Sequence, residues 1–181
     1  MAKNPTLVAA SDAAALANGS HGNPFGVLGP HRTKAGPVVR AFLPQARRAW
    51  VVGPAGDVEM DRVPDSDMFA ASVDDATARS YRLRLEYQDG RLDTIDDPYR
   101  FPPVLGDLDI HLLIEGSHLR TFEKLGSHCV TVDGVQGVHF AVWAPNAQRV
   151  SVVGDFNGWD GRRHVMRLRH DAGVWEIFIP G

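Results

Sequence analysis

Apolar and polar residues alternate along much of this chain, and the alternation predicts short antiparallel strands. Residues 38–43, 46–53 and 81–87 show it in the first half, and residues 138–143 and 148–153 show it in the second. Proline, glycine and asparagine separate these runs, as expected where a strand reverses direction. We therefore predict an all-β fold in which helices are confined to the amino terminus and a short bridge.

The pattern occurs twice along the chain. Residues 38–53 match residues 139–154 at an offset of 101. The matched residues are Pro44 with Pro145, Ala46 with Ala147, Arg48 with Arg149, Val51-Val52 with Val152-Val153, and Gly53 with Gly154. Further along, residues 68–70 resemble residues 174–176. Segments of this size indicate two copies of one domain type, because each is too long for a solenoid unit.

The two copies differ in length. The first continues through residues 81–87 and a hairpin turn at residues 88–91 to about Phe101, whereas the second ends at Gly181 before any such hairpin. We expect two tandem immunoglobulin-like antiparallel β-sandwiches of similar topology, the second one truncated. The residues expected to face inward are Val51, Val52, Val152 and Val153.

The predicted strands and turns divide the chain into four segments. Residues 1–36 form an amino-terminal helix and turn segment, 37–101 the first sandwich, 102–126 a helical bridge, and 127–181 the incomplete second sandwich. Within the first segment, Ser11-Asp12 is expected to cap a short helix that runs through Ala17.

The bridge is predicted to be helical and packed. Asp107 can cap a helix over residues 108–115, which Gly116 ends, and Ser117 can cap a second turn through Leu125. Apolar residues recur at helical spacing in that second turn, namely Leu119, Phe122 and Leu125. This apolar content predicts that the bridge packs against a domain.

Composition excludes several classes of protein. A net charge of −3 with mixed signs argues against a nucleic-acid partner, which usually meets a basic face. The single cysteine, Cys129, excludes a disulfide framework and fits a reducing compartment. No apolar run suits a secretory signal or a membrane span, so we expect a cytoplasmic protein without a membrane partner. The basic pairs Arg162-Arg163 and Arg167/Arg169 are interpreted as solvated strand edges.

No catalytic centre can be assembled from these residues. Glycosidic chemistry needs two carboxylates that face each other, but the acidic residues here cluster in turns, and the tightest pair, Asp96-Asp97, precedes a proline. The eight histidines lack metal-ligand spacing, and no phosphate or dinucleotide motif is present. We predict no catalytic residue, no metal site and no cofactor in this chain.

The segment 154–160, Gly-Asp-Phe-Asn-Gly-Trp-Asp, is the strongest candidate for a binding site. An exposed tryptophan on a polar, glycine-containing loop is costly in water unless its ring stacks on a partner, and the apolar face of a sugar ring is a natural one. Trp143 and Trp175, which lie on alternating strands, are instead predicted to pack in the core.

From His21 onward the chain resembles the amino-terminal part of bacterial 1,4-alpha-glucan (glycogen) branching enzymes of glycoside hydrolase family 13. Residues 21–29, 97–109 and 115–120 are similar to that family's first domain and bridge, while residues 137–147 and 154–160 resemble a family 48 carbohydrate-binding module. The resemblance implies a parent transferase that moves α-1,4 glucan segments to α-1,6 branch points. It also implies that the catalytic carboxylates belong to a following barrel outside these residues.

The resemblance assigns carbohydrate contact to Trp159 and Asn157. It also implies a second aromatic residue and a lysine beyond Gly181, and it leaves open that the face bearing Trp159 contacts the catalytic barrel of the parent chain instead of α-1,4-glucan. Two other readings remain: a stand-alone glycogen-binding or regulatory module, and an interaction sandwich without sugar affinity.

Overall fold

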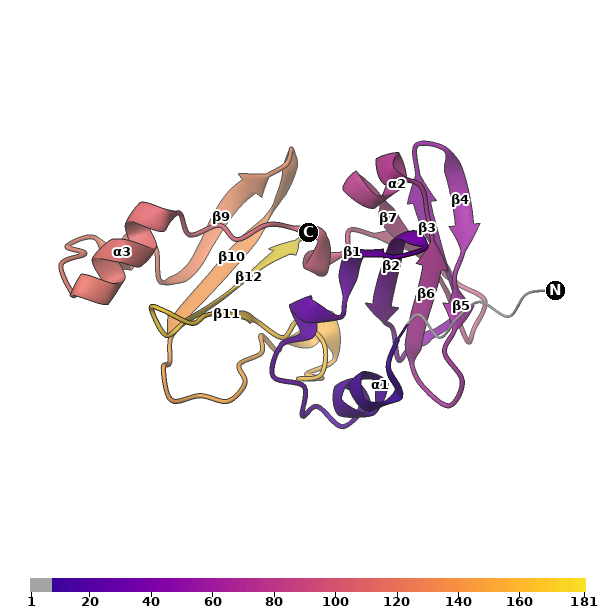
Figure 1. Ribbon diagram of the computed structural model, residues 1–181, viewed down its shortest axis with the longest axis horizontal. Coiled ribbons are helices and arrows are strands. Elements are labelled where there is room, and N and C mark those ends of the chain that lie inside the picture. The colour runs from indigo at the N-terminus through magenta and orange to yellow at the C-terminus, as the bar shows by residue number, and fades with distance from the viewer. Residues whose placement is uncertain (1–7) are drawn as a thin grey trace. The chain divides into compact units, whose positions relative to one another are not determined.

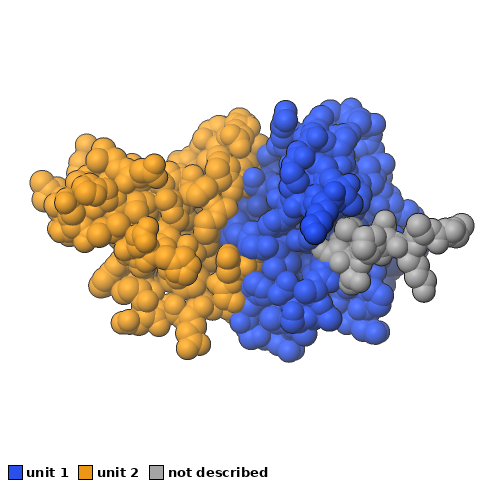
Figure 2. Space-filling view, viewed as in Figure 1, with its two compact units in different colours: residues 1–21, 25–100 blue, residues 22–24, 101–181 orange. Residues whose placement is uncertain are grey.

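A computed structural model describes residues 8–181 and shows three antiparallel four-stranded sheets with a few short helices (Figure 1). The predicted all-β fold is therefore confirmed. The chain divides into two compact units (Figure 2). Unit 1 extends to His21 and resumes over Phe25–Arg100, and unit 2 consists of Gly22–Pro24 with Phe101–Gly181. The four predicted segment boundaries stay predictions.

Unit 1 is a sandwich of two sheets. The first sheet has the order β1 (Gly29–Thr33), β2 (Gly36–Phe42), β6 (Met68–Ser72), β5 (Asp61–Arg62), and the second has the order β4 (Gly56–Glu59), β3 (Ala46–Gly53), β7 (Arg82–Tyr87), β8 (Leu92–Ile95). Alternate residues of both sheets form one buried core, including Val39 and Phe69 from the first and Val51, Leu83 and Leu85 from the second. The alternation read from the sequence thus marks the inner faces.

Short helices complete unit 1. Helix α1 (Ala10–Ala17) buries Ala13 and Leu16 in a second cluster with Phe42 and Met68, on the other face of the first sheet. The helix ends at Ala17, as predicted. Its N-cap residue is Ala9 instead of Ser11 or Asp12, and no side chain caps it. The other helices of unit 1 are α2 (Asp75–Arg79) and η2 (Pro98–Arg100), and η1 (Pro24–Gly26) spans the boundary at which unit 1 resumes.

Unit 2 contains one sheet, with the order β11 (Arg167–Arg169), β12 (Val174–Pro180), β10 (Val135–Trp143), β9 (Gly126–Val132). Its ladder repeats that of unit 1. Arg40 of β2 lies opposite Ala70 of β6, and their counterparts Ala141 of β10 and Glu176 of β12 lie opposite each other. The edge strands β5 and β11 also pair in corresponding register. The predicted internal repeat is therefore confirmed at the level of individual residue pairs.

The predicted strand at residues 148–153 is wrong. Only one bridge forms there, between Ser151 and Val165, and Val153 is exposed. In unit 1 the counterpart strand β3 is held between β4 and β7, whereas the described residues of unit 2 contain no strand that corresponds to β7. A segment without ladder partners does not form a strand, however strongly its sequence alternates. Among the valines expected inside, Val51 is fully buried, whereas Val52 and Val152 are only half-buried.

The bridge is less helical than predicted. Helix α3 spans Asp107–Glu115, one residue earlier than expected, and ends at Gly116 in the left-handed conformation. Only the single turn η3 (Thr121–Glu123) follows. Leu125 packs against the unit 2 core, but Leu119 is 94% exposed and Phe122 is also exposed. The predicted packing fails for these two residues: the predicted second helical segment is reduced to one turn, which leaves Leu119 outside it.

A buried ion cluster holds the start of the bridge on the unit 2 sheet. Glu176, only 2% exposed, accepts hydrogen bonds from the backbone N–H groups of Val104 (2.8 Å) and Leu105 (3.0 Å) and from His139 Nε2 (3.1 Å). Its other oxygen accepts from Arg169 Nη1 at 2.7 Å. Burial opposes ionisation of Glu176, but these hydrogen bonds outweigh it and lower its pKa to about 2.

This cluster corrects the interpretation of the arginines of β11. Arg169 also donates to the carbonyl of Leu105 at 2.9 Å, and Arg167 donates to the carbonyl of Phe101 at 3.0 Å. Both side chains thus bind the bridge instead of projecting into solvent. A glutamate within the apolar run of residues 174–179 was the sequence signal for this cluster, because a charge there must be paired.

Candidate carbohydrate-binding loop

Trp159 projects from the loop that follows the short helix η4 (Asp155–Asn157). The residue is 66% exposed and has a backbone φ of +59°, which follows Gly158 with a φ of +65°. Its indole Nε1 donates a hydrogen bond to Asp155 Oδ1 at 2.8 Å. Because Nε1 lies in the plane of the ring, this bond orients the indole without covering its faces. The loop therefore presents an oriented aromatic platform.

Asn157 lies inside the same loop and is only 2% exposed. Its Oδ1 accepts from the N–H of Gly154 at 3.0 Å, and its Nδ2 donates to the carbonyl of Val152 at 2.8 Å. The same amide nitrogen lies 3.0 Å from His164 Nδ1. These bonds engage both polar atoms of the amide within the protein. Sugar contact by Asn157 stays a prediction, and the observed geometry shows that its side chain shapes the loop.

His164 closes the loop as a neutral acceptor. Burial and, secondarily, the charge of Arg163 lower the pKa of its imidazole to about 4. Nδ1 can then accept the hydrogen bond from the amide of Asn157. The ring also meets the edge of Phe156, with centroids 5.3 Å apart. His164 is therefore neutral at neutral pH, and its hydrogen bond with Asn157 is available there.

The basic pair Arg162-Arg163 also belongs to this loop. The Arg162 guanidinium binds the carboxylate of Asp160 (2.7 Å), and the resulting hydrogen bonds lower the pKa of Asp160. Arg163 donates to the carbonyl of Asn157 at 3.3 Å. The interpretation of this pair as a solvated strand edge is therefore wrong.

The two strand tryptophans have different environments. Trp175 is buried and donates its Nε1 to the carbonyl of Ala144 at 3.0 Å, as predicted for a core residue. Trp143 is 61% exposed, so its predicted core packing is wrong. Its counterpart Phe42 is buried in unit 1 by the cluster that includes α1. The exposed apolar residues of unit 2 outside the bridge are Val142, Trp143, Val153, Phe156 and Trp159.

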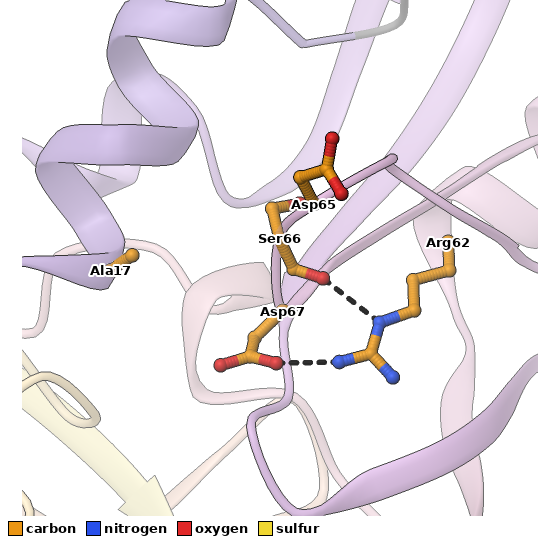
Figure 3. A pocket seen from close by; sticks show the side chains of 5 residues that line it. All are labelled: Ala17, Arg62, Asp65, Ser66 and Asp67. Carbon is orange, nitrogen blue, oxygen red and sulfur yellow. Dashed lines mark hydrogen bonds and ion pairs between the residues drawn. The ribbon is translucent and has the colours of Figure 1, made fainter.

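Acidic residues do not form a catalytic pair in the hollow that Figure 3 shows in unit 1. This open hollow of about 300 Å³ is lined by Asp65 and Asp67, together with Arg62, Ser66 and Ala17. Arg62 binds Asp67 at 2.6 Å and the carbonyl of Ser66 at 2.8 Å. The carboxylate of Asp65 points away from that of Asp67 (Figure 3). The two carboxylates therefore cannot act across one bond.

The pair Asp96-Asp97 is structural. Asp97 is buried and accepts from Tyr81 Oη at 2.6 Å and from the N–H of Tyr99 at 2.9 Å, while Asp96 binds Arg100 at 2.8 Å. Burial raises the pKa of Asp97 to about 6, more than these hydrogen bonds lower it. Within residues 8–181 no group of three or more His, Cys, Asp or Glu side chains could hold a metal ion. None of the helices in this range could span a membrane.

Two family descriptions match the chain. Residues 9–99 match the amino-terminal domain of the alpha-1,4-glucan branching enzyme GlgB. The chain belongs to this GlgB family. Residues 124–181 match carbohydrate-binding module 48, the isoamylase N-terminal domain. The resemblance drawn from the sequence is confirmed.

Curated relatives agree with this assignment. The 1,4-alpha-glucan branching enzyme GlgB of Paramagnetospirillum magneticum is 63% identical over 175 residues, covering 97% of this chain and 23% of the relative. Those of Rhodopseudomonas palustris (52% over 170 residues, 93% and 23% covered) and Cereibacter sphaeroides (51% over 178 residues, 97% and 24% covered) are also similar. This GlgB-family chain spans about a quarter of the length of these relatives.

Proposed function

We propose that this chain is the non-catalytic amino-terminal region of a cytoplasmic 1,4-alpha-glucan branching enzyme and that it binds α-1,4-glucan through Trp159. The parent enzyme would transfer α-1,4 glucan segments to α-1,6 branch points, using carboxylates outside these residues. The observation that carries the proposal is the exposed, oriented indole of Trp159 on a loop that matches a carbohydrate-binding module.

The loop geometry supports separate roles for the two predicted binding residues. Trp159 supplies an apolar face on which a glucose ring stacks, and Asn157 positions the backbone that carries it. A single aromatic contact contributes only about 1 kcal/mol beyond the area that it buries. We therefore expect weak binding, with a Kd no better than roughly millimolar.

A second role for unit 2 is docking of the catalytic domain. Four further apolar residues of unit 2 are exposed, namely Val142, Trp143, Val153 and Phe156. Exposed apolar residues of this kind mark interaction sites in many proteins. A domain that covers Trp159 as well would remove the sugar platform, so the two roles make opposite predictions for glucan binding.

Titration of maltoheptaose, followed by NMR, separates these roles. Trp159→Ala should abolish the ligand-induced shifts, whereas Trp143→Ala, which removes a similarly exposed indole on a strand, should leave them unchanged. Equal binding by Trp159→Ala and the unsubstituted chain would exclude the sugar role. If neither binds and Trp159→Ala destabilises a full-length enzyme, the docking role is supported instead.

A further inference from the structure

The edge strands of the three sheets differ in how they are protected against pairing with another chain. Unpaired strand edges template association, and proteins guard them with charges or proline. Among the strands formed by residues 8–181, four of the six edges carry such guards: Pro30 and Arg32 in β1, Asp57 and Glu59 in β4, Asp61 and Arg62 in β5, and Asp93 in β8. The fifth edge, β11, is only three residues long, and its two arginines bind the bridge. The sixth edge, β9, reads GSHCVTV and contains neither proline nor Asp, Glu, Lys or Arg.

Strand β9 is also the longest of these edges, with seven residues. It pairs with β10 on one side, and it is the last strand of its sheet on the other (Figure 1). Its residues Ser127, Cys129 and Thr131 are exposed. These side chains are small, so a further strand can approach the free edge without steric conflict. In the internal repeat, β1 of unit 1 corresponds to β9, and β1 carries the guards that β9 lacks.

We propose that β9 pairs with β9 of a second copy of this chain, antiparallel and about a two-fold axis at Cys129. Two identical edges are self-complementary under such an axis, which is the commonest symmetry of soluble dimers. Cys129 is the central residue of the strand and would lie opposite Cys129 of the second copy. Ser127 would then lie opposite Thr131, a cross-strand pair of hydroxyl side chains that is favourable in sheets. The two sheets would become one continuous sheet.

A second copy fits this edge better than an unrelated partner does. Partners that add a strand to a sheet gain affinity from the main chain and specificity from side-chain pockets or charges. Apart from His128, whose ring bonds to the carbonyl of Leu125, strand β9 has no charged or aromatic side chain, so it supplies little means of selecting a dissimilar chain. Two-fold pairing needs no such selection, because both edges present the same short side chains.

Sedimentation velocity over about a hundredfold range of protein concentration tests the proposal. The unsubstituted chain should show a reversible monomer–dimer equilibrium. Cys129→Lys places like charges opposite each other and should weaken dimerisation about tenfold or more. Gln136→Lys is the matched control, because Gln136 is exposed on the same face directly opposite Thr131 but lies on the inner strand β10. This control should dimerise like the unsubstituted chain.

Oxidative crosslinking reports the register. Cys129 is the only cysteine, so a disulfide-linked dimer must join two copies of it. Added copper(II)–phenanthroline accepts the two electrons, as two Cu(II) ions become Cu(I), and the two thiol protons pass to the solvent. The native chain should crosslink much more than the chain in urea, and Cys129→Ser should dimerise without crosslinking.

A monomeric native chain would overturn the proposal. A dimer as tight in Cys129→Lys as in the unsubstituted chain would also overturn it and would favour the exposed apolar residues around Trp143 as the interface.

Discussion

The two units contain the same ladder but differ in what covers it. In unit 1 the inner face of β2 and β6 lies against the second sheet, with Leu83 and Leu85 in one buried core. In unit 2 the corresponding face leaves Val142 exposed, and no second sheet forms among the described residues. The comparison shows that local pattern determines the pairing of neighbouring strands, whereas burial depends on a partner that is distant in sequence.

The opposite face also differs between the units. In unit 1 it is apolar and covered by α1, with Ala70 at the position that Glu176 occupies in unit 2. In unit 2 the buried carboxylate of Glu176 accepts hydrogen bonds from two backbone N–H groups of the bridge, and His139 and Arg169 of the sheet hold that carboxylate in place. The same face of the repeated sheet thus holds α1 by hydrophobic contact in unit 1 and the bridge by charged hydrogen bonds in unit 2.

Removing Glu176 should therefore have the largest effect of any single change considered. Glu176→Ala leaves Arg169 without its buried counter-ion and two backbone N–H groups without acceptors, so unit 2 should lose about 3–5 kcal/mol of stability. Urea titration followed by residue-resolved NMR would measure the loss in β12. The control Glu115→Ala removes an exposed carboxylate of the same unit and should change stability by less than about 0.5 kcal/mol. A similar small loss for Glu176→Ala would show that the cluster is not important for stability.

The buried carboxyl of unit 1 should give the opposite response to pH. Asp97 has a pKa of about 6 instead of its usual 3.8, so the folded state binds the proton more tightly than the unfolded state. Its contribution is present below about pH 4 and is lost as the pH rises through about 6, on the order of 2–3 kcal/mol. Asp97→Asn should abolish this slope in unit 1.

Glu176 provides the contrast for that measurement. Its pKa of about 2 lies below the usual 4.5, so its contribution to unit 2 is present above about pH 4.5 and is lost as the pH falls through about 2. Between pH 7 and 5, unit 1 should gain stability while the Glu176 contribution to unit 2 stays constant. Residue-resolved urea titrations at both pH values measure the two units separately. A slope that persists in Asp97→Asn would assign the effect to other groups.

Much of the fold could be predicted from the sequence because its information is local. Pro44 and Pro145, with the residues around them, identified the repeat, and the corresponding strands of the two units pair in the same register. Residues 148–153 and Trp143 could not be predicted in the same way. Their sequences match β3 and Phe42, but their structures depend on neighbours that the second unit lacks among the described residues.

The candidate site was predictable only in part. The exposure of Trp159 follows from its place on a polar loop, and it was expected. The role of Asn157 was not, because an asparagine before glycine is read as a turn residue until its acceptors and donors are seen. His164 gave no signal at all in the sequence, since its function depends on burial beside that amide.

A matched pair of valines gives the smallest and most direct test of the comparison between the units. Val51 is fully buried, and Val51→Ala removes two methyl groups from a closed core, which should cost unit 1 about 2 kcal/mol. Val152 occupies the same place in the repeat but is only half-buried and lacks strand partners, so Val152→Ala should cost unit 2 less than about 1 kcal/mol. Residue-resolved urea titrations of both variants compare the two losses directly. Equal losses would mean that residues 148–153 lie in a core as closed as that of unit 1, and the contrast between the units would then disappear.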